Sequence, residues 1–153
     1  MRINRNIIHW AMSLMLASVP LSPALAGDSA EQLAAELNGQ WNAAFNRGDA
    51  AAVAALYAED ATLSPGNGET LEGRDSIREL FQSFIDNGVH DHSIEIIEAH
   101  QSGDVLYEVA RWQAHSTDAD GEPTSFGGVL LNTFRRGADG VWRSHVHVWN
   151  AGS

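Results

Sequence analysis

Three short turn sequences divide the second half of the chain, and this division most limits the folds that the chain can adopt. The turns lie at 102–104, 118–121 and 137–140 and carry the Gly and Asp residues that hairpins favour. We therefore predict four strands in an antiparallel meander, at about 92–101, 104–116, 123–135 and 141–150. Such a sheet offers one face to helices and the other to solvent or a partner.

The first half of the chain shows helical spacing of its apolar residues. A capping box at Ser29 opens a run that predicts a helix over 29–46. A short second helix to about Tyr57, a short strand over 61–63 and a third helix capped by Asp75 follow. The predicted order is α-α-β-α-β-β-β-β, an α+β fold. If the sheet curves around the three helices, it encloses a cone-shaped pocket.

The first 26 residues have the pattern of a secretory signal peptide. Arg2 and Arg5 precede a mostly apolar stretch, and Ala24-Leu25-Ala26 is a typical cleavage signal. We expect cleavage after Ala26, a single domain over 27–153, and a periplasmic or secreted location. No later stretch is apolar enough to span a membrane, so we expect no membrane partner after removal of the leader.

The composition excludes several classes of chemistry. The chain has no cysteine and no lysine, which removes disulfides, thiolate chemistry and Schiff bases. After the leader, seven arginines stand against 20 acidic residues. Nucleic-acid binding needs a basic surface, so we expect no nucleic-acid partner.

Two stretches resemble a known family. The segment WNAAFNRGDAAAVAALYAEDATLSPGNGETLEGRDSIRELF (41–81) and the closing GVWRSHVHVWN resemble the nuclear transport factor 2-like superfamily. The SnoaL-like and SgcJ/EcaC-type members are the most similar. The resemblance covers about 29–150 and implies the cone fold. It leaves function open, because the superfamily holds isomerases, cyclases, dehydratases, carriers and oligomerisation domains.

Ketosteroid isomerases within that superfamily use an Asp base and an oxyanion hole made by Tyr and a protonated Asp. By motif, these three positions fall at or beside Ser64, at Trp41 and at Asn132. Ser cannot replace the Asp base, whereas Trp and Asn keep hydrogen-bond donors. The isomerase constellation is therefore absent as such.

The resemblance also implies which side chains line the pocket. Alternation along the last strand places His145, His147 and Trp149 on its inner face. The neighbouring strand would add Asn132, with Leu130 and Phe134 beside it. The helices and first strand opposite would contribute Trp41, Phe45, Tyr57, Phe81 and Phe84. A mostly aromatic cavity with a few polar groups is typical of a small-molecule site.

The two histidines of the last strand are the candidate acid and base, because imidazole titrates near neutral pH. Asp60 or Glu108 could orient one imidazole, and Asn132 could hold a developing oxyanion. The alternative is that both histidines only line the pocket. A metal site built on the two His-x-His motifs is a further alternative, with His92, His100, His115 or Glu108 as third ligand. We predict neither a metal nor a cofactor.

The functional expectation is a pocket for a small apolar or aromatic molecule, in an isomerase, cyclase or hydro-lyase that needs no cofactor. A ligand-binding protein without chemistry and an oligomerisation module remain alternatives. Strand 104–116 is nearly equally apolar on both faces, so periodicity does not assign its inward face. Apolar residues on both faces favour a homodimer formed through the outer side of the sheet.

Overall fold

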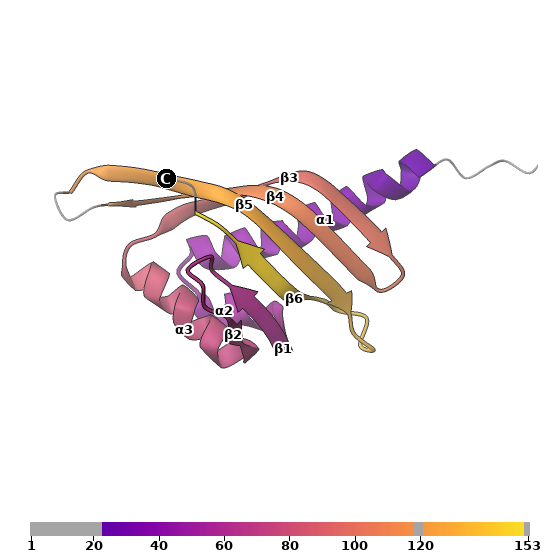
Figure 1. Ribbon diagram of the computed structural model, residues 1–153, viewed down its shortest axis with the longest axis horizontal. Coiled ribbons are helices and arrows are strands. Elements are labelled where there is room, and N and C mark those ends of the chain that lie inside the picture. The colour runs from indigo at the N-terminus through magenta and orange to yellow at the C-terminus, as the bar shows by residue number, and fades with distance from the viewer. Residues whose placement is uncertain (1–22, 118–120, 152–153) are drawn as a thin grey trace, which may run out of the picture.

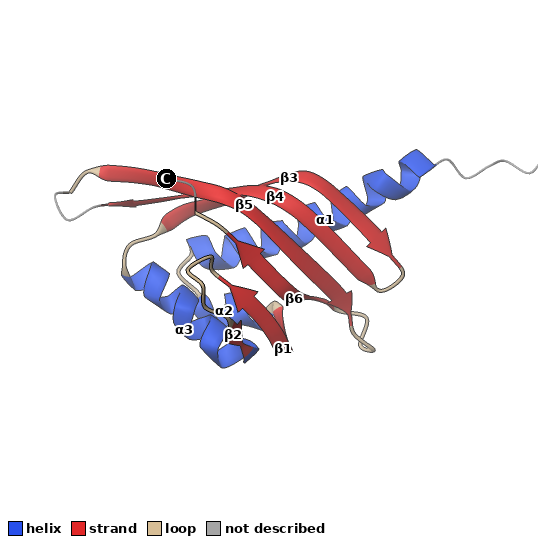
Figure 2. Ribbon diagram, in the orientation of Figure 1, coloured by secondary structure: helices blue, strands red, loops and turns tan. Residues whose placement is uncertain are grey.

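The computed structural model describes residues 23–117 and 121–151, which form three helices and one six-stranded sheet (Figures 1 and 2). The helices are α1 (Pro23–Asn46), α2 (Ala50–Ala55) and α3 (Gly73–Asp86). The strands are β1 (Tyr57–Ser64), β2 (Leu71–Glu72), β3 (His90–Ser102), β4 (Val105–Thr117), β5 (Pro123–Arg136) and β6 (Trp142–Trp149).

The sheet has the order β2-β1-β6-β5-β4-β3 and is not closed. β1 and β6 run parallel, and the other neighbouring pairs are antiparallel. The predicted α+β fold with a mainly antiparallel, curved sheet is confirmed. In Figure 1, α1 runs behind β3, β4 and β5, and α2 and α3 lie beside β1. None of the described helices is long and apolar enough to cross a membrane.

Several element boundaries differ from the prediction. α1 starts at Pro23 rather than 29, so the predicted cleavage point after Ala26 lies within its first turns. Residues 1–22 of the predicted leader lie outside the described residues. α2 ends at Ala55, and Tyr57 opens a longer β1. Asp75 does not cap α3: it lies in the first turn, and Glu72 holds the cap position without a side-chain bond.

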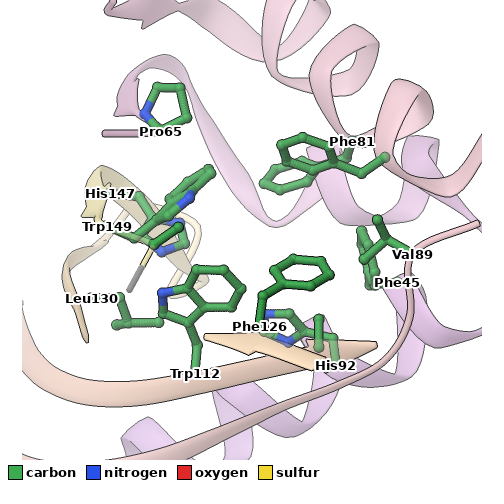
Figure 3. Close-up of a pocket in the computed structure, with 13 residues that line it drawn as sticks. Phe45, Pro65, Phe81, Val89, His92, Trp112, Phe126, Leu130, His147 and Trp149 are labelled. Carbon is green, nitrogen blue, oxygen red and sulfur yellow. The ribbon is translucent and has the colours of Figure 1, made fainter. Parts of the chain in front are cut away.

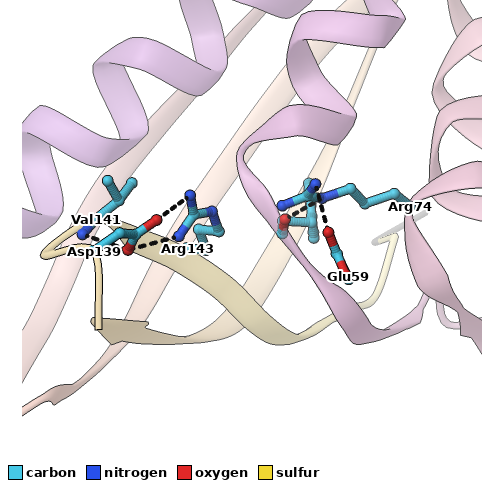
Figure 4. A network of polar contacts seen from close by, with 6 residues as sticks. Glu59, Arg74, Asp139, Val141 and Arg143 are labelled. Carbon is cyan, nitrogen blue, oxygen red and sulfur yellow. Dashed lines mark hydrogen bonds and ion pairs between the residues drawn. The ribbon is translucent and has the colours of Figure 1, made fainter. Parts of the chain in front are cut away.

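The start of β1 is fixed by Arg74 at the beginning of α3. The Arg74 Nε donates to the Tyr57 carbonyl oxygen at 2.7 Å, and its guanidinium lies 3.8 Å from Glu59 (Figure 4). The same view shows Asp139 holding the β5–β6 turn, where it accepts hydrogen bonds from Arg143 and from the Val141 amide. Because Tyr57 reaches the interior, the Arg74 contact helps to place an internal side chain.

The core lies between the helices and the inner face of the sheet, in two clusters. The larger joins α1, α2, α3 and β1 and includes Trp41, Phe45, Tyr57, Leu63, Ile77 and Phe81. The smaller joins the start of α1 to β4 and β5 through Ala30, Ala34, Leu106 and Phe134. Aromatic side chains dominate the larger cluster, and the cavity described below opens from it.

A bulge in β6 changes the strict alternation that the sequence suggests. Ser144 pairs with Phe134 and Val146 pairs with Thr133, so His145 is the extra residue on β6. A bulge of this kind moves the following side chains by one position. Ser144, His147 and Trp149 therefore share the inner face, and His145 does not.

Candidate functional site

A cavity of about 300 Å³ lies between the helices and the inner face of the sheet (Figure 3). Its lining is almost entirely apolar and includes six phenylalanine and tryptophan side chains. The lining residues are Phe45, Pro65, Phe81, Phe84, Val89, His92, Trp112, Ala114, Phe126, Leu130, His147, Trp149 and Ala151. The only side chains of this set that carry nitrogen are two imidazoles and two indoles. The volume lies at the lower end of the range for small-molecule sites.

Of the predicted pair on β6, only His147 lines the cavity. It is 4% exposed and packs against Trp149, with ring centroids 4.9 Å apart. His145 does not line the cavity, which corrects the sequence-based expectation. Its Nδ1 lies 3.7 Å from a carboxylate oxygen of Asp60, whose side chain is 82% exposed. The β6 bulge is the physical reason, because it removes His145 from the face of His147.

His147 is the last of three buried side chains that are linked by hydrogen bonds. The indole N–H of Trp41 donates to the Tyr57 hydroxyl at 3.1 Å, and that hydroxyl lies 2.8 Å from His147 Nδ1. Burial raises the pKa of Tyr57 above its ordinary value, and the Trp41 bond opposes this only weakly. Burial, with a smaller effect from nearby His92, lowers the pKa of His147 to about 3. Both groups are therefore neutral at pH 7.

His92 lines the cavity from the start of β3, and α1 holds it at both backbone and side chain. Asn46 donates to the His92 carbonyl oxygen at 2.9 Å and accepts from the His92 amide at 2.7 Å. One turn earlier, Asn42 Oδ1 lies 2.8 Å from His92 Nδ1. The ring lies between Trp41 and Trp112. Burial lowers the pKa of His92 to about 4, so this imidazole is also neutral at pH 7.

A second, smaller cavity of about 20 Å³ lies deeper, and His147 lines both. Its polar lining includes Asn132, whose Oδ1 accepts from the Ser144 hydroxyl at 2.6 Å. Asn132 pairs with His147 on one side and with Glu108 on the other. Glu108 is fully buried, and Asn38 donates to its Oε2 at 2.8 Å. Burial raises the pKa of Glu108 to about 7, although the Asn38 bond opposes the shift.

Residues 39–145 match the model of the SnoaL-like domain. The chain belongs to the SnoaL-like domain family. No curated protein matches it.

Solved structures support the fold. A ketosteroid isomerase-like protein from Erwinia carotovora atroseptica is 27% identical, with a TM-score of 0.69 over 82% of this chain and 95% of its own. A putative dehydratase of the NTF2-like family from Streptomyces avermitilis is 18% identical, with a TM-score of 0.65 over 82% and 98%. A putative aromatic ring hydroxylase from Novosphingobium aromaticivorans is 22% identical, with a TM-score of 0.66 over 80% and 89%.

The SnoaL-like fold places the remaining predicted residues in three environments. Phe45, Phe81, Phe84, Leu130 and Trp149 line the larger cavity. Trp41, Asn132 and Phe134 line the smaller one, and Tyr57 is fully buried beside His147. Asp60 lies at the exposed surface. Ser64, at the position of the isomerase base, donates to the Glu69 carbonyl oxygen and lines neither cavity.

The sequence suggests His92 only as a possible metal ligand, and it does not place the lining residues His92, Trp112 and Phe126 in the pocket. The signal was present: His92, Ile94 and Ile96 alternate with polar residues, and all three are less exposed than their neighbours. Across residues 23–117 and 121–151, no three His, Cys, Asp or Glu side chains lie close enough to hold a metal ion.

Proposed function

We propose that this SnoaL-like domain binds a small, planar, largely apolar molecule and moves a proton on it without a cofactor. The observation that carries the proposal is the pair of imidazoles, a buried His147 and a half-buried His92, in an otherwise apolar cavity. Isomerisation, cyclisation and loss of water need such a transfer when they pass through the enolate of a carbonyl compound. The aromatic lining suits a planar substrate.

His92 is the candidate base and His147 the candidate hydrogen-bond donor to a developing oxyanion. A base with a pKa of about 4 is weak, but it is fully unprotonated at pH 7. Ketosteroid isomerases use an Asp base with a pKa of about 4.6, because their oxyanion is strongly stabilised. A hydrogen bond from His147 would act in an apolar cavity, where it is stronger than in water.

In this proposal His147, rather than Asn132 or the Trp41 N–H, donates to the developing oxyanion. The Trp41 N–H is used by Tyr57, and Asn132 lines the smaller cavity, where Ser144 bonds its oxygen. His147 is the side chain shared by both cavities, and its Nε2, which is buried in this structure, has no partner among the described residues. Asn132 then lies next to His147 on the neighbouring strand and lines the smaller cavity with it.

The test is exchange of the acidic hydrogens of beta-tetralone, a compact ketone fused to a benzene ring, in deuterated buffer, followed by proton NMR. We expect exchange that depends on the protein and falls by about a hundredfold in His92→Gln and in His147→Phe. His145→Gln is the matched control, because His145 lies on the same strand outside the cavity. Exchange no faster than in buffer, or equal loss in the control, would overturn the proposal.

Ligand binding without chemistry is the second candidate, and the depressed pKa values of both imidazoles favour it, since weakly basic groups serve well as hydrogen-bonding contacts. Quenching of tryptophan fluorescence separates the two functions, because Trp112 and Trp149 line the cavity. Saturable quenching by beta-tetralone without hydrogen exchange would support the binding protein.

We also propose that the domain acts in the periplasm or outside the cell. The basic start, the apolar stretch and the Ala-x-Ala signal before Gly27 support this location. N-terminal sequencing of protein purified from the source organism tests it, with Gly27 as the expected first residue.

A further inference from the structure

Asn150 ends the pairing of β6 with β5. Its backbone N–H donates to the Val129 carbonyl oxygen at 3.1 Å, as the next residue of a strand would. Its side chain then takes the place of the backbone acceptor, because Asn150 Oδ1 accepts from the Val129 amide at 2.9 Å. The Asn150 carbonyl group can therefore turn away from β5, and the chain leaves the sheet at this residue.

Gly128 provides the space into which the Asn150 carbonyl group turns. A Cβ on Gly128 would collide with the Asn150 carbonyl oxygen, so no other residue fits here unless the chain moves. Gly128 is not one of the glycines with positive φ, and the close approach alone requires glycine at this position. The indole N–H of Trp112 donates to the same carbonyl oxygen at 3.1 Å. Three hydrogen bonds and one close contact thus hold Asn150 against β4 and β5.

Residues 150–151, here called the strap, form one wall of the aromatic cavity. Ala151 lines the cavity, and so does Pro65 in the loop after β1. A Cβ on Gly66, the next residue of that loop, would lie 3.2 Å from the Asn150 Cα, so the loop and the strap are in contact. Both strap residues are exposed, and solvent therefore lies beyond this wall.

The strap lies at one end of the cavity. Figure 3 shows Pro65 on one side of the cavity, with Phe45 and Val89 on the opposite side. A ligand that extends from Phe45 towards Pro65 therefore meets the strap with its far end. The strap also orients the lining side chain Trp112, whose ring stacks on His92 with centroids 5.9 Å apart.

We propose that the strap sets the greatest length of ligand that the cavity accepts, and that the ligand is a compact neutral aromatic molecule without a long chain. This inference rests on the proposed function, because it needs the cavity to be a ligand site. An ionised ligand would lose hydration without gaining an opposite charge, since no Arg, Asp or Glu lines the cavity in the part of the chain that the structure describes. Asn150 and Gly128 are positioning residues, because they hold the wall without lining the cavity.

The place of the strap is measured first, without ligand, by hydrogen exchange of the Val129 amide and the Trp112 indole N–H in NMR spectra. Both hydrogens should exchange slowly in the wild type, because both are donated to Asn150. Gly128→Ala pushes the Asn150 carbonyl group away, so both should exchange about tenfold faster, the worth of one hydrogen bond. Gly39→Ala is the matched control, since a Cβ on this exposed helix glycine meets nothing within 4 Å. Fast exchange of both hydrogens in the wild type would overturn the proposed wall.

The length limit is measured with phenyl ketones of increasing chain length, from acetophenone to decanophenone, by quenching of tryptophan fluorescence. In the wild type, affinity should rise about fourfold for each added methylene group while the chain fits. It should then fall about tenfold or more in the homologues that reach the strap, because they overfill the cavity. In Gly128→Ala the longest homologues should bind as tightly as the best one, because their chains can pass the displaced strap into solvent. Gly39→Ala should keep the wild-type limit.

Asn150 offers a second way to open the wall, which replaces Gly128→Ala should that variant fail to fold. Asn150→Ala removes the Oδ1 acceptor and should raise the limit. Asn150→Asp retains an oxygen acceptor at the same place and should keep the wild-type limit.

The outcomes separate this inference from the proposed function. If no ketone binds to the wild type, the cavity is not a site for such ligands, and both the proposed function and this inference fail. If the ketones bind without any length limit, or with the same limit in the wild type and in Gly128→Ala, this inference fails and the proposed function stands.

Discussion

Glu108 is a fully buried carboxyl group whose oxygens differ in their contacts. Asn38 donates to Oε2, and Oε1 has no partner among the described residues. Burying a carboxylate with one neutral donor favours its protonated form, which explains the raised pKa of about 7. Because the folded pKa exceeds the ordinary value of 4.5, this group stabilises the fold fully below about pH 4.5. That stability is lost as the pH rises through about 7.

Glu108→Gln should isolate this effect. The amide keeps the shape and cannot ionise, so the variant should gain stability relative to wild type by about 3 kcal/mol between pH 4.5 and pH 8. Urea unfolding followed by tryptophan fluorescence measures the difference at each pH. Glu98→Gln, an exposed change on the neighbouring strand, is the control. A difference between Glu108→Gln and wild type that stays constant with pH would contradict the buried-acid description.

His92 should give a pH dependence of the opposite sign. Its folded pKa of about 4 lies below the ordinary 6.5, so its contribution is present above pH 6.5 and is lost as the pH falls through about 4. The stability of wild type relative to His92→Gln should therefore fall by about 3 kcal/mol from pH 7 to pH 4. The same urea titrations measure it. A relative stability that rises on acidification would show that His92 is charged in the folded protein.

The ends of β1 and β6 meet beside the cavity, where Gly66 follows Pro65. Gly66 has φ of +80°, and an added Cβ would lie 2.5 Å from the Trp149 carbonyl oxygen. Gly66→Ala should therefore cost about 2 kcal/mol or more, through both backbone strain and collision. Gly68→Ala is the matched control, since it has φ of +89° and open space around the added Cβ. If both variants lose the same stability in thermal unfolding, backbone strain alone explains the loss, and the expected collision with the Trp149 carbonyl oxygen is wrong.

The sequence predicted most elements correctly because their signals are local. Turn residues mark the four long strands, and apolar spacing marks the helices. Two features of the site depend on tertiary contacts that no local pattern contains. The β6 bulge against Phe134 removed His145 from the cavity, and the contact of α1 with the start of β3 brought His92 into it. The aromatic lining from Phe45, Phe81 and Trp149 was accessible from the sequence through the family resemblance.

No described helix covers the outer face of the sheet. Large apolar side chains gather there on neighbouring strands: Tyr107, Val129, Leu131 and Val148 are all exposed, and Leu131 pairs with Val148. We propose that a second copy of the chain packs on this face. A two-fold dimer presents the same patch twice, so an uncharged apolar centre is self-complementary.

Leu131→Asp should turn this dimer into a monomer, because two buried carboxylates would face each other across the two-fold axis. Sedimentation velocity of the wild type and the variant measures the change. Val141→Asp is the control, since Val141 is equally exposed but lies in the β5–β6 turn. A wild type that stays monomeric at all concentrations, or a dimer unaffected by Leu131→Asp, would contradict the proposed interface.

Native mass spectrometry of the protein purified from its source organism tests the central claim most directly, namely that the aromatic cavity is a ligand site. We expect one small, largely apolar molecule per chain, released on denaturation. It should be absent from Val89→Trp, which fills the cavity from its lining. It should be retained in His145→Gln, which leaves the cavity unchanged. A spectrum that shows only the bare chain, or a molecule that Val89→Trp retains equally, would contradict the account.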